Sequence, residues 1–135
     1  RAHDGGDADE DDELSAREKG QRAERVAAWH LRKRGYRIIE SNWWAPGRRG
    51  ELDIIARDGQ TLVAIEVKSY PKGDLTPGES LSFEKRRRLR RLIKQYAKMN
   101  RHLDCSLRID LLVVEWTKDG GGADIDHIEN AVTAN

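Results

Sequence analysis

The chain has 135 residues, of which 37% are hydrophobic and 36% are charged, and its formal net charge is +1. This length suits one domain with a single modest core. No run of about 18 apolar residues occurs and the first residues lack the apolar centre of a signal peptide, so we expect neither a membrane partner nor export. The single cysteine, Cys105, cannot form an internal disulfide, which fits a cytoplasmic protein.

The charge is distributed unevenly along the chain. Residues 1–15 carry seven acidic side chains against one arginine, which leaves 24 basic and 17 acidic side chains in residues 16–135. The acidic segment has too few apolar residues to offset the entropy lost on ordering. We therefore predict a disordered acidic tail over residues 1–15 and a folded, basic domain over residues 16–135. The tail is either a solubilising extension or a mimic of nucleic-acid phosphates that lies across the basic domain.

Hydrophobic periodicity predicts seven elements in the order αβββαββ. The first helix begins at Ser15, where Ser15 and Glu18 form a capping-box pattern, and it ends at Gly35. A second helix follows Ser82, a favourable N-cap residue. Strands are expected over residues 36–42, 51–57, 61–68, 107–116 and 125–128. This order indicates an α/β protein.

The second helix has two unlike faces. An apolar stripe recurs at helical spacing, formed by Leu89, Leu92, Ile93 and Tyr96. The remaining surface holds nine basic residues within 17 positions: Lys85, Arg86, Arg87, Arg88, Arg90, Arg91, Lys94, Lys98 and Arg101. This surface is either solvated or a binding site for phosphates, which arginine grips in a bidentate manner. On the second interpretation, the residues that contact nucleic acid are Arg48, Arg49, Lys85, Arg87, Arg91 and Lys94.

For three further residues the sequence leaves two interpretations open. Trp43 and Trp44 adjoin the two loop arginines, and an aromatic ring there either stacks on a base or belongs to the core. Asp110 stands inside an apolar strand. It either holds an arginine or a helix end at the sheet or supports a catalytic site indirectly.

A hairpin is predicted around Asp58-Gly59, because this pair favours a tight turn between strands. With these two residues as the turn, Asp53 pairs with Ala64 and Glu51 pairs with Glu66. Asp53 and Glu66 are then diagonal neighbours, about 7–8 Å apart on one face of the hairpin.

Acidic residues and a lysine gather on this face. Two carboxylates can share a hard cation, so Asp53 and Glu66 predict a site for Mg²⁺ or Mn²⁺. Lys68 lies two positions beyond Glu66 on the same face, where its ammonium can orient or deprotonate an attacking water. The other interpretation is the solvated face of an ordinary hairpin. Leu62 and Ala64 interrupt the charges on this face, which favours the metal site.

The hairpin carries a resemblance to a known family. The run Gly50-Glu51-Leu52-Asp53-Ile54-Ile55-Ala56-Arg57, followed by Val63-Ala64-Ile65-Glu66-Val67-Lys68, resembles the core motif of the bacterial YraN-like family. That family is similar to PD-(D/E)xK nucleases and to archaeal Holliday-junction resolvases. Glu24, Ala27 and Leu31 fit its first-helix pattern, and residues 108–110 and 128–131 resemble its last strands. The resemblance covers roughly residues 16–133.

The resemblance implies a restriction-endonuclease-like fold, in which a mixed central sheet is flanked by helices and the hairpin carries the active site. It implies that Glu24, Asp53, Glu66 and Lys68 are catalytic and that the three acids bind the metal. Leu52 stands where the name motif has proline, as is general among YraN-like members. Related resolvases are dimers, so a homodimer is left open.

Two functions follow from these patterns. The first is a Mg²⁺-dependent endonuclease acting on DNA, with branched or structured DNA as a candidate substrate. The alternative is a non-cleaving nucleic-acid-binding adaptor, because a nuclease fold does not guarantee nuclease activity. The complete set of Asp53, Glu66 and Lys68, which a pure binder does not need, favours the enzyme.

Overall fold

The structure is a computed structural model that describes residues 5–74, 81–102, 104–119 and 121–134, with side chains from residue 17 onward. Its elements are α1 (Gly5–Lys33), β1 (Arg37–Trp44), the short 3-10 helix η1 (Pro46–Arg48), β2 (Glu51–Asp58), β3 (Thr61–Pro71), α2 (Phe83–Met99), β4 (Ser106–Trp116) and β5 (Ala123–Val132). The predicted order αβββαββ is confirmed. None of the helices in the described ranges is long and apolar enough to cross a membrane.

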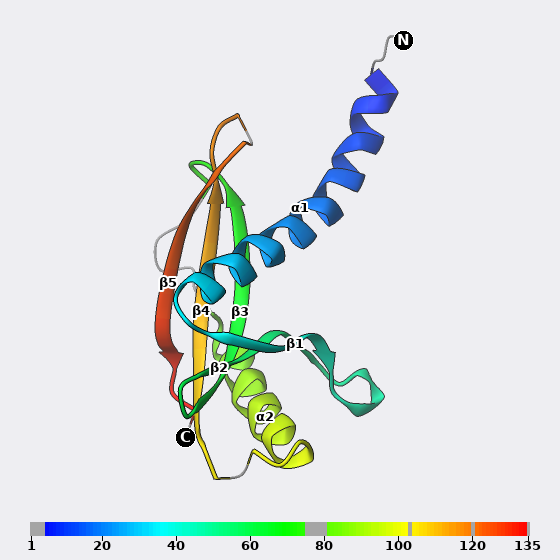
Figure 1. Ribbon diagram of the computed structural model, residues 1–135. Coiled ribbons are helices and arrows are strands. Elements are labelled where there is room, and N and C mark those ends of the chain that lie inside the picture. The colour runs from blue at the N-terminus through cyan, green and yellow to red at the C-terminus, as the bar shows by residue number, and fades with distance from the viewer. Residues whose placement is uncertain (1–4, 75–80, 103, 120, 135) are drawn as a thin grey trace.

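The five strands form one mixed sheet in the order β1-β2-β3-β4-β5. Neighbouring strands are antiparallel except β3 and β4, which are parallel and are joined through α2. Helix α1 lies against one face of the sheet and α2 against the other (Figure 1). This arrangement is the predicted restriction-endonuclease-like fold.

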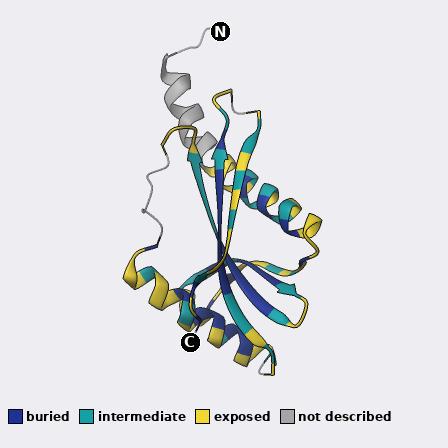
Figure 2. Ribbon diagram, turned by 90° about the vertical axis from the view of Figure 1, so that its left-hand side faces the viewer, coloured by how far each residue is buried: buried dark blue, intermediate teal, exposed yellow. Residues whose placement is uncertain are grey.

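Two apolar clusters, one on each face of the sheet, form the core (Figure 2). On one face, Ala23, Ala27 and Leu31 of α1 are buried against side chains of β2, β3 and β4. On the other, the predicted stripe of α2 is buried in full: Leu89, Leu92, Ile93 and Tyr96. Because β3 is covered on both faces, its consecutive residues 62–65 are all buried and apolar.

Helix α1 begins at Gly5, well before the predicted start at Ser15, while residues 1–4 lie outside the described residues. Helix α1 therefore includes residues 5–14, which the sequence assigns to the acidic tail. Acidic residues near a helix N-terminus interact favourably with the helix dipole, which explains how this segment can continue the helix. The C-terminal end is as predicted, since Gly35 has a φ of +89° and the amide of Tyr36 bonds to the carbonyl of Leu31. The division of the chain at residue 16 stays a prediction.

The predicted register of the β2–β3 hairpin is wrong by two residues. Asp58 pairs with Thr61 and Ile54 pairs with Ile65, so the turn is Gly59-Gln60 and Asp53 does not face Ala64. Gly59 has a φ of +60° and takes the first turn position, where one of the tight hairpin turns requires glycine. A shift of two residues keeps every side chain on its predicted face.

Candidate functional site

Strands β2 and β3 separate where the acidic residues stand. Their ladder ends at the pair Ile54–Ile65, although β2 begins at Glu51 and β3 continues to Pro71. Asp53 lies just beyond the last pair, and its Oδ2 accepts a hydrogen bond of 2.9 Å from the backbone amide of Val67. The carboxylate of Asp53 is thereby fixed between the diverging strands.

Glu66 lies level with Asp53 when the register is continued by one residue, and its side chain is only 7% exposed. The Nζ atom of Lys85, in the first turn of α2, is 3.1 Å from Oε2 of Glu66. Ser82 positions this turn, because its Oγ accepts a hydrogen bond from the amide of Lys85. Lys85, predicted to contact nucleic acid, therefore pairs with a predicted metal ligand.

Glu24 approaches this site from α1. It is half-buried, and the Nδ2 of Asn42 at the end of β1 donates a hydrogen bond of 3.2 Å to its Oε1. A cavity of about 490 Å³ opens beside it, with Arg25 and Arg32 also in its wall. Helix α1 thus directs one acid toward the end of the sheet at which β2 and β3 separate.

The acids influence one another's protonation. Burial raises the pKa of Asp53 to about 7, and the negative charges of Glu66, Glu24 and Glu51 add to this rise against the opposing amide of Val67. Burial also raises the pKa of Glu51, as do the charges of Glu24 and Glu66. Carboxylates from α1, β2 and β3 therefore lie close enough to repel one another, which is the condition that a bound cation relieves.

Lys68 belongs to the same face as Glu66 because side chains alternate along a strand. It is half-buried, and Tyr70, two residues further, packs against the core on the α2 side. The structure thus brings together the four residues predicted to be catalytic: Glu24, Asp53 and Glu66 by their electrostatic coupling, and Lys68 by its position on β3.

The donor set suits a hard divalent cation, since it consists of carboxylate oxygens whose negative charges add to the effect of burial in raising the pKa of Asp53. Within the described ranges, no three His, Cys, Asp or Glu side chains are arranged as a complete metal cage. Oxygens of Asp53 and Glu66 are held by the Val67 amide and by Lys85. A cation would be held by Glu24, Asp53 and Glu66 only with some rearrangement of their side chains.

The predicted basic residues of α2 form an exposed surface beside this site. Arg87, Arg91 and Lys94 are all exposed. Arg91 donates a hydrogen bond of 3.0 Å to the carbonyl of Arg49, which ties α2 to the loop that leads into β2. A shallow hollow of about 250 Å³ lies among Glu84, Arg87, Arg88 and Arg91. Helical spacing explains why these four residues lie on one side of α2.

The two adjacent tryptophans have different roles. Trp43 is buried and meets Tyr96 edge-on with ring centroids 5.2 Å apart, whereas Trp44 is 43% exposed. The guanidinium of Arg48 lies 4.9 Å from the ring centre of Trp44. A similar pair begins α2, where Phe83 is 69% exposed and Arg87 lies 5.8 Å from its ring centre. Sequence reasoning missed Phe83, although its position outside the apolar stripe of α2 was a usable signal.

Asp110 holds an arginine at the sheet, which is the first of the two interpretations that the sequence left open. It is fully buried and accepts hydrogen bonds of 2.9 Å from Arg108 Nε and from the amide of Asn130. The Nε2 of His127, a residue for which the sequence offered no role, is 2.8 Å from its Oδ2. Burial alone would raise the pKa of Asp110, but these hydrogen bonds hold it below its usual range. Asp110 pairs with Ile65, so it faces α1, on the side of the sheet opposite to Glu66.

The fold and the site define the class of protein. A mixed sheet between two helices, with acids where two strands diverge, is the restriction-endonuclease-like arrangement. Residues 23–114 match the model described as "Uncharacterised protein family UPF0102", and the chain belongs to this family. This confirms the resemblance to the YraN-like family, and the matched range includes all four candidate catalytic residues.

Similar proteins come from distant bacteria. A UPF0102 protein of Porphyromonas gingivalis is 38% identical over 115 residues, which are 84% of this chain and 83% of the relative. One of Carboxydothermus hydrogenoformans is 37% identical over 76% of this chain and 86% of its own length. One of Alkaliphilus oremlandii is 36% identical over 83% of this chain and 95% of its own length. The similarity thus spans most of the fold.

Proposed function

We propose that this protein is a metal-dependent endonuclease that hydrolyses phosphodiester bonds in DNA. Glu24, Asp53 and Glu66 hold Mg²⁺ or Mn²⁺, and Lys68 acts beside them. The observation that carries the proposal is the position of Asp53, which is fixed between diverging strands with its pKa raised to about 7 by burial and by neighbouring acids. A fold gains nothing from this repulsion, whereas a cation site requires the converging carboxylates.

The bound cation supplies Lewis-acid activation of the phosphate and of water. The chain's own residues provide the remainder of the chemistry. Lys68 positions its ammonium near Glu66, where it orients the attacking water and stabilises negative charge that develops on the phosphate. Lys85 balances the charge of the buried Glu66 carboxylate through a contact of 3.1 Å. The basic surface of α2 and the loop arginines, Arg48 and Arg49, hold the strand that is cleaved.

Two exposed aromatic rings suggest how bases are bound. Trp44 pairs with Glu51 in the sheet, and Phe83 is in the same helical turn as Lys85, which contacts Glu66. Each ring thus belongs to a residue whose backbone lies near a residue of the acid site, and each has an arginine beside it. Exposed rings stack on unpaired bases. We therefore expect DNA with unpaired or splayed nucleotides, as in branched forms, to be preferred over plain duplex.

The test is a cleavage assay with Mg²⁺ or Mn²⁺ on single-stranded, duplex, flap and four-way DNA. Cleavage should stop in chelator. Lys68→Ala should reduce turnover by about two orders of magnitude or more while changing DNA affinity less than about tenfold, because one cation among many is lost. Lys33→Ala, which replaces an exposed lysine at the C-terminal end of α1 and outside the basic surface of α2, is the matched control. Equal losses of affinity and turnover in Lys68→Ala would make that lysine an ordinary phosphate contact.

A second function, a DNA-binding adaptor that does not cleave, is favoured by one observation. Lys85 already neutralises Glu66 at 3.1 Å, in the position that a cation would compete for. On this alternative, the protein binds the same DNA forms and cleaves none of them with either metal. We also propose that the protein acts in the cytoplasm, and that a four-way junction is bound by a homodimer, which light scattering with and without junction DNA tests.

A further inference from the structure

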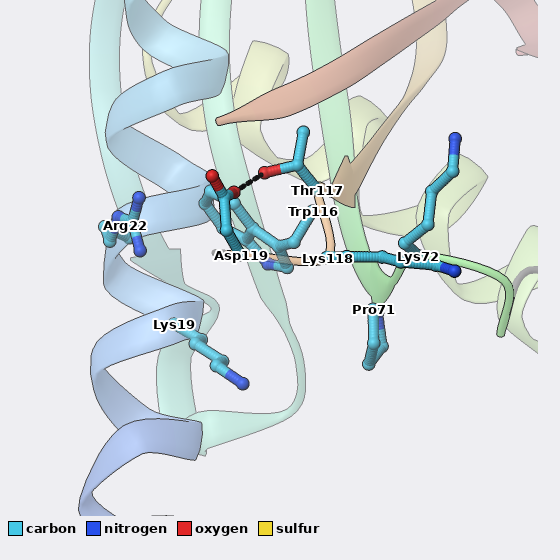
Figure 3. A pocket seen from close by; sticks show the side chains of 8 residues that line it. All are labelled: Lys19, Arg22, Pro71, Lys72, Trp116, Thr117, Lys118 and Asp119. Atoms are coloured by element: carbon cyan, nitrogen blue, oxygen red, sulfur yellow. Dashed lines mark hydrogen bonds between the residues drawn. The ribbon is translucent and has the colours of Figure 1, made fainter. Parts of the chain in front are cut away.

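A pocket of about 470 Å³, lined largely by charged side chains, lies between α1 and the ends of β3 and β4 (Figure 3). Residues from α1, from the end of β3 and from the end of β4 line it, among them Lys19, Arg22, Lys72, Trp116, Lys118 and Asp119. The last residues of the two parallel strands, Pro71 and Trp116, pair with each other and bring the latter two segments together.

The pocket is distinct from the candidate catalytic site. Along β3 it lies roughly 16 Å beyond Glu66 at the usual rise of a strand. On α1, Arg22 and Glu24 are two positions apart and so point to different sides of the helix. Trp116 belongs to the core on the α1 face, whereas Glu66 contacts α2.

The pocket has an excess of positive charge. Four basic side chains line it, and Asp119 is the one acid in its described wall. Oδ1 of Asp119 accepts hydrogen bonds from Thr117 Oγ1 at 2.6 Å and from the amide of Gly121 at 2.9 Å, which lower its pKa. Asp124 lies 3.8 Å from Lys72, but both side chains are largely exposed, so this pair neutralises little.

Trp116 supplies an observation independent of charge. Its side chain is buried, and within the described part of the chain its Nε1 has no hydrogen-bond partner. A buried N–H without an acceptor is costly, so a ligand with acceptor oxygens would be favoured here. The guanidinium of Arg22 lies 4.6 Å from the centre of the indole ring and adds positive charge beside it. The pocket therefore suits an oxyanion.

We propose that this pocket binds a phosphate group. Lys19, Lys72 and Lys118 supply positive charge from three segments of the chain, and the indole of Trp116 donates a hydrogen bond to one phosphate oxygen. The phosphate belongs either to a small molecule, such as a nucleotide, or to the backbone of a nucleic acid that also reaches the acid site. The same phosphate oxygens are recognised in both cases. Phosphate binding in this pocket does not depend on whether the protein cleaves DNA.

The indole N–H resonance of Trp116 reports binding directly. In ¹⁵N-labelled full-length protein with chelator present, inorganic phosphate, adenosine monophosphate and a short single-stranded oligonucleotide are titrated separately at constant ionic strength, with chloride as the blank. Trp116→Phe identifies the resonance, and through-bond assignment replaces this variant if it does not fold. We expect a saturable shift with at least one phosphate compound and none with chloride.

Charge variants give the second readout. Lys118→Gln and Lys72→Gln should each weaken phosphate binding about tenfold, as expected for the loss of one charged contact. Lys33→Gln, at the C-terminal end of α1 and outside both the pocket and the basic surface of α2, should leave it unchanged. A response to phosphate or nucleotide assigns a small-molecule site, and a response to the oligonucleotide alone assigns a nucleic-acid backbone contact. The proposal is overturned if phosphate, nucleotide and oligonucleotide all fail to move the Trp116 resonance saturably, or if Lys33→Gln weakens binding as much as the pocket variants.

Discussion

Asp53 and Asp110 are two aspartates on strands of the same sheet whose surroundings have opposite effects. Asp110, between Arg108, His127 and a backbone amide, has a lowered pKa, while burial and neighbouring acids raise that of Asp53 to about 7. Burial opposes ionisation of both. The partners decide the outcome: donors make Asp110 part of the scaffold, whereas like charges make Asp53 a position of unrelieved repulsion. A buried acid is therefore a functional candidate when its neighbours fail to compensate it.

The largest effect is expected at Asp110. Replacement by alanine removes the carboxylate that His127 contacts and leaves Arg108 with the carboxylate of Asp58. Breaking a buried ion pair from one side costs roughly 3–5 kcal/mol. The free energy of unfolding in urea measures this. Asp110 also stabilises the native state above its unfolded-state pKa, and this contribution disappears as the pH falls through its lowered pKa. A loss below about 1 kcal/mol in Asp110→Ala would contradict a scaffold role.

Asp53→Asn should have the opposite sign. The pKa of Asp53 is raised from 3.8 to about 7, so its contribution is fully present below pH 3.8 and is lost as the pH rises through 7. A pKa shift of this size changes the free energy of unfolding by as much as about 4 kcal/mol. In chelator at pH 8, Asp53→Asn should therefore be more stable than the parent by roughly 2–4 kcal/mol, and its stability should change less between pH 4 and pH 8.

The same variant should also lose the effect of metal on stability. Millimolar Mn²⁺ should raise the melting temperature of the parent, because a ligand that binds only the folded state stabilises it, and should leave Asp53→Asn unchanged. Thermal melts of both proteins in chelator and in Mn²⁺ provide the measurement. If the parent ignores Mn²⁺ and the variant is no more stable in chelator, the acidic face is ordinary surface and the metal site does not exist.

Lys85→Gln sharpens the comparison by removing a cation that contacts Glu66. The pair is only partly exposed, so we expect the free energy of unfolding in chelator to fall by about 1 kcal/mol. In Mn²⁺ this loss should shrink, because the cation then neutralises Glu66 in place of Lys85. Urea unfolding with and without Mn²⁺ measures both values, and Lys98→Gln controls for loss of helix charge. An equal loss with and without metal would show that no cation reaches Glu66.

The smallest effect concerns the basic surface, whose charges act singly. Each phosphate contact contributes about 0.9 to the slope of log affinity against log salt on duplex DNA. Replacing Arg87 or Lys94 by glutamine should therefore reduce that slope by roughly this amount and weaken binding to all sequences alike. Arg91 also donates a hydrogen bond to the carbonyl of Arg49, so its replacement by glutamine should in addition lower the free energy of unfolding slightly. Fluorescence anisotropy at several salt concentrations is the measurement. An unchanged slope would leave the surface as solvated charge.

Local patterns were enough to predict the element order, the apolar stripe of α2 and the set of residues on the acidic face. Each depends on a period of two or 3.6 residues, which the chain carries in itself. Ser82 and Gly35 marked helix ends for the same reason, since a cap depends on residues within one turn. Even the wrong hairpin register preserved the face, because the error was an even number of residues.

Only the tertiary structure decided which of these residues meet. The turn at Gly59-Gln60 brought Asp53 level with Glu66, and the packing of α2 brought Lys85 to Glu66. Burial separated Trp43 from Trp44, and His127 reached Asp110 from another strand. These contacts join segments far apart in the chain, and their geometry depends on how two helices lie on a twisted sheet. No local period encodes that, so pairing of charges, and with it the pKa of each acid, appears only in the folded protein.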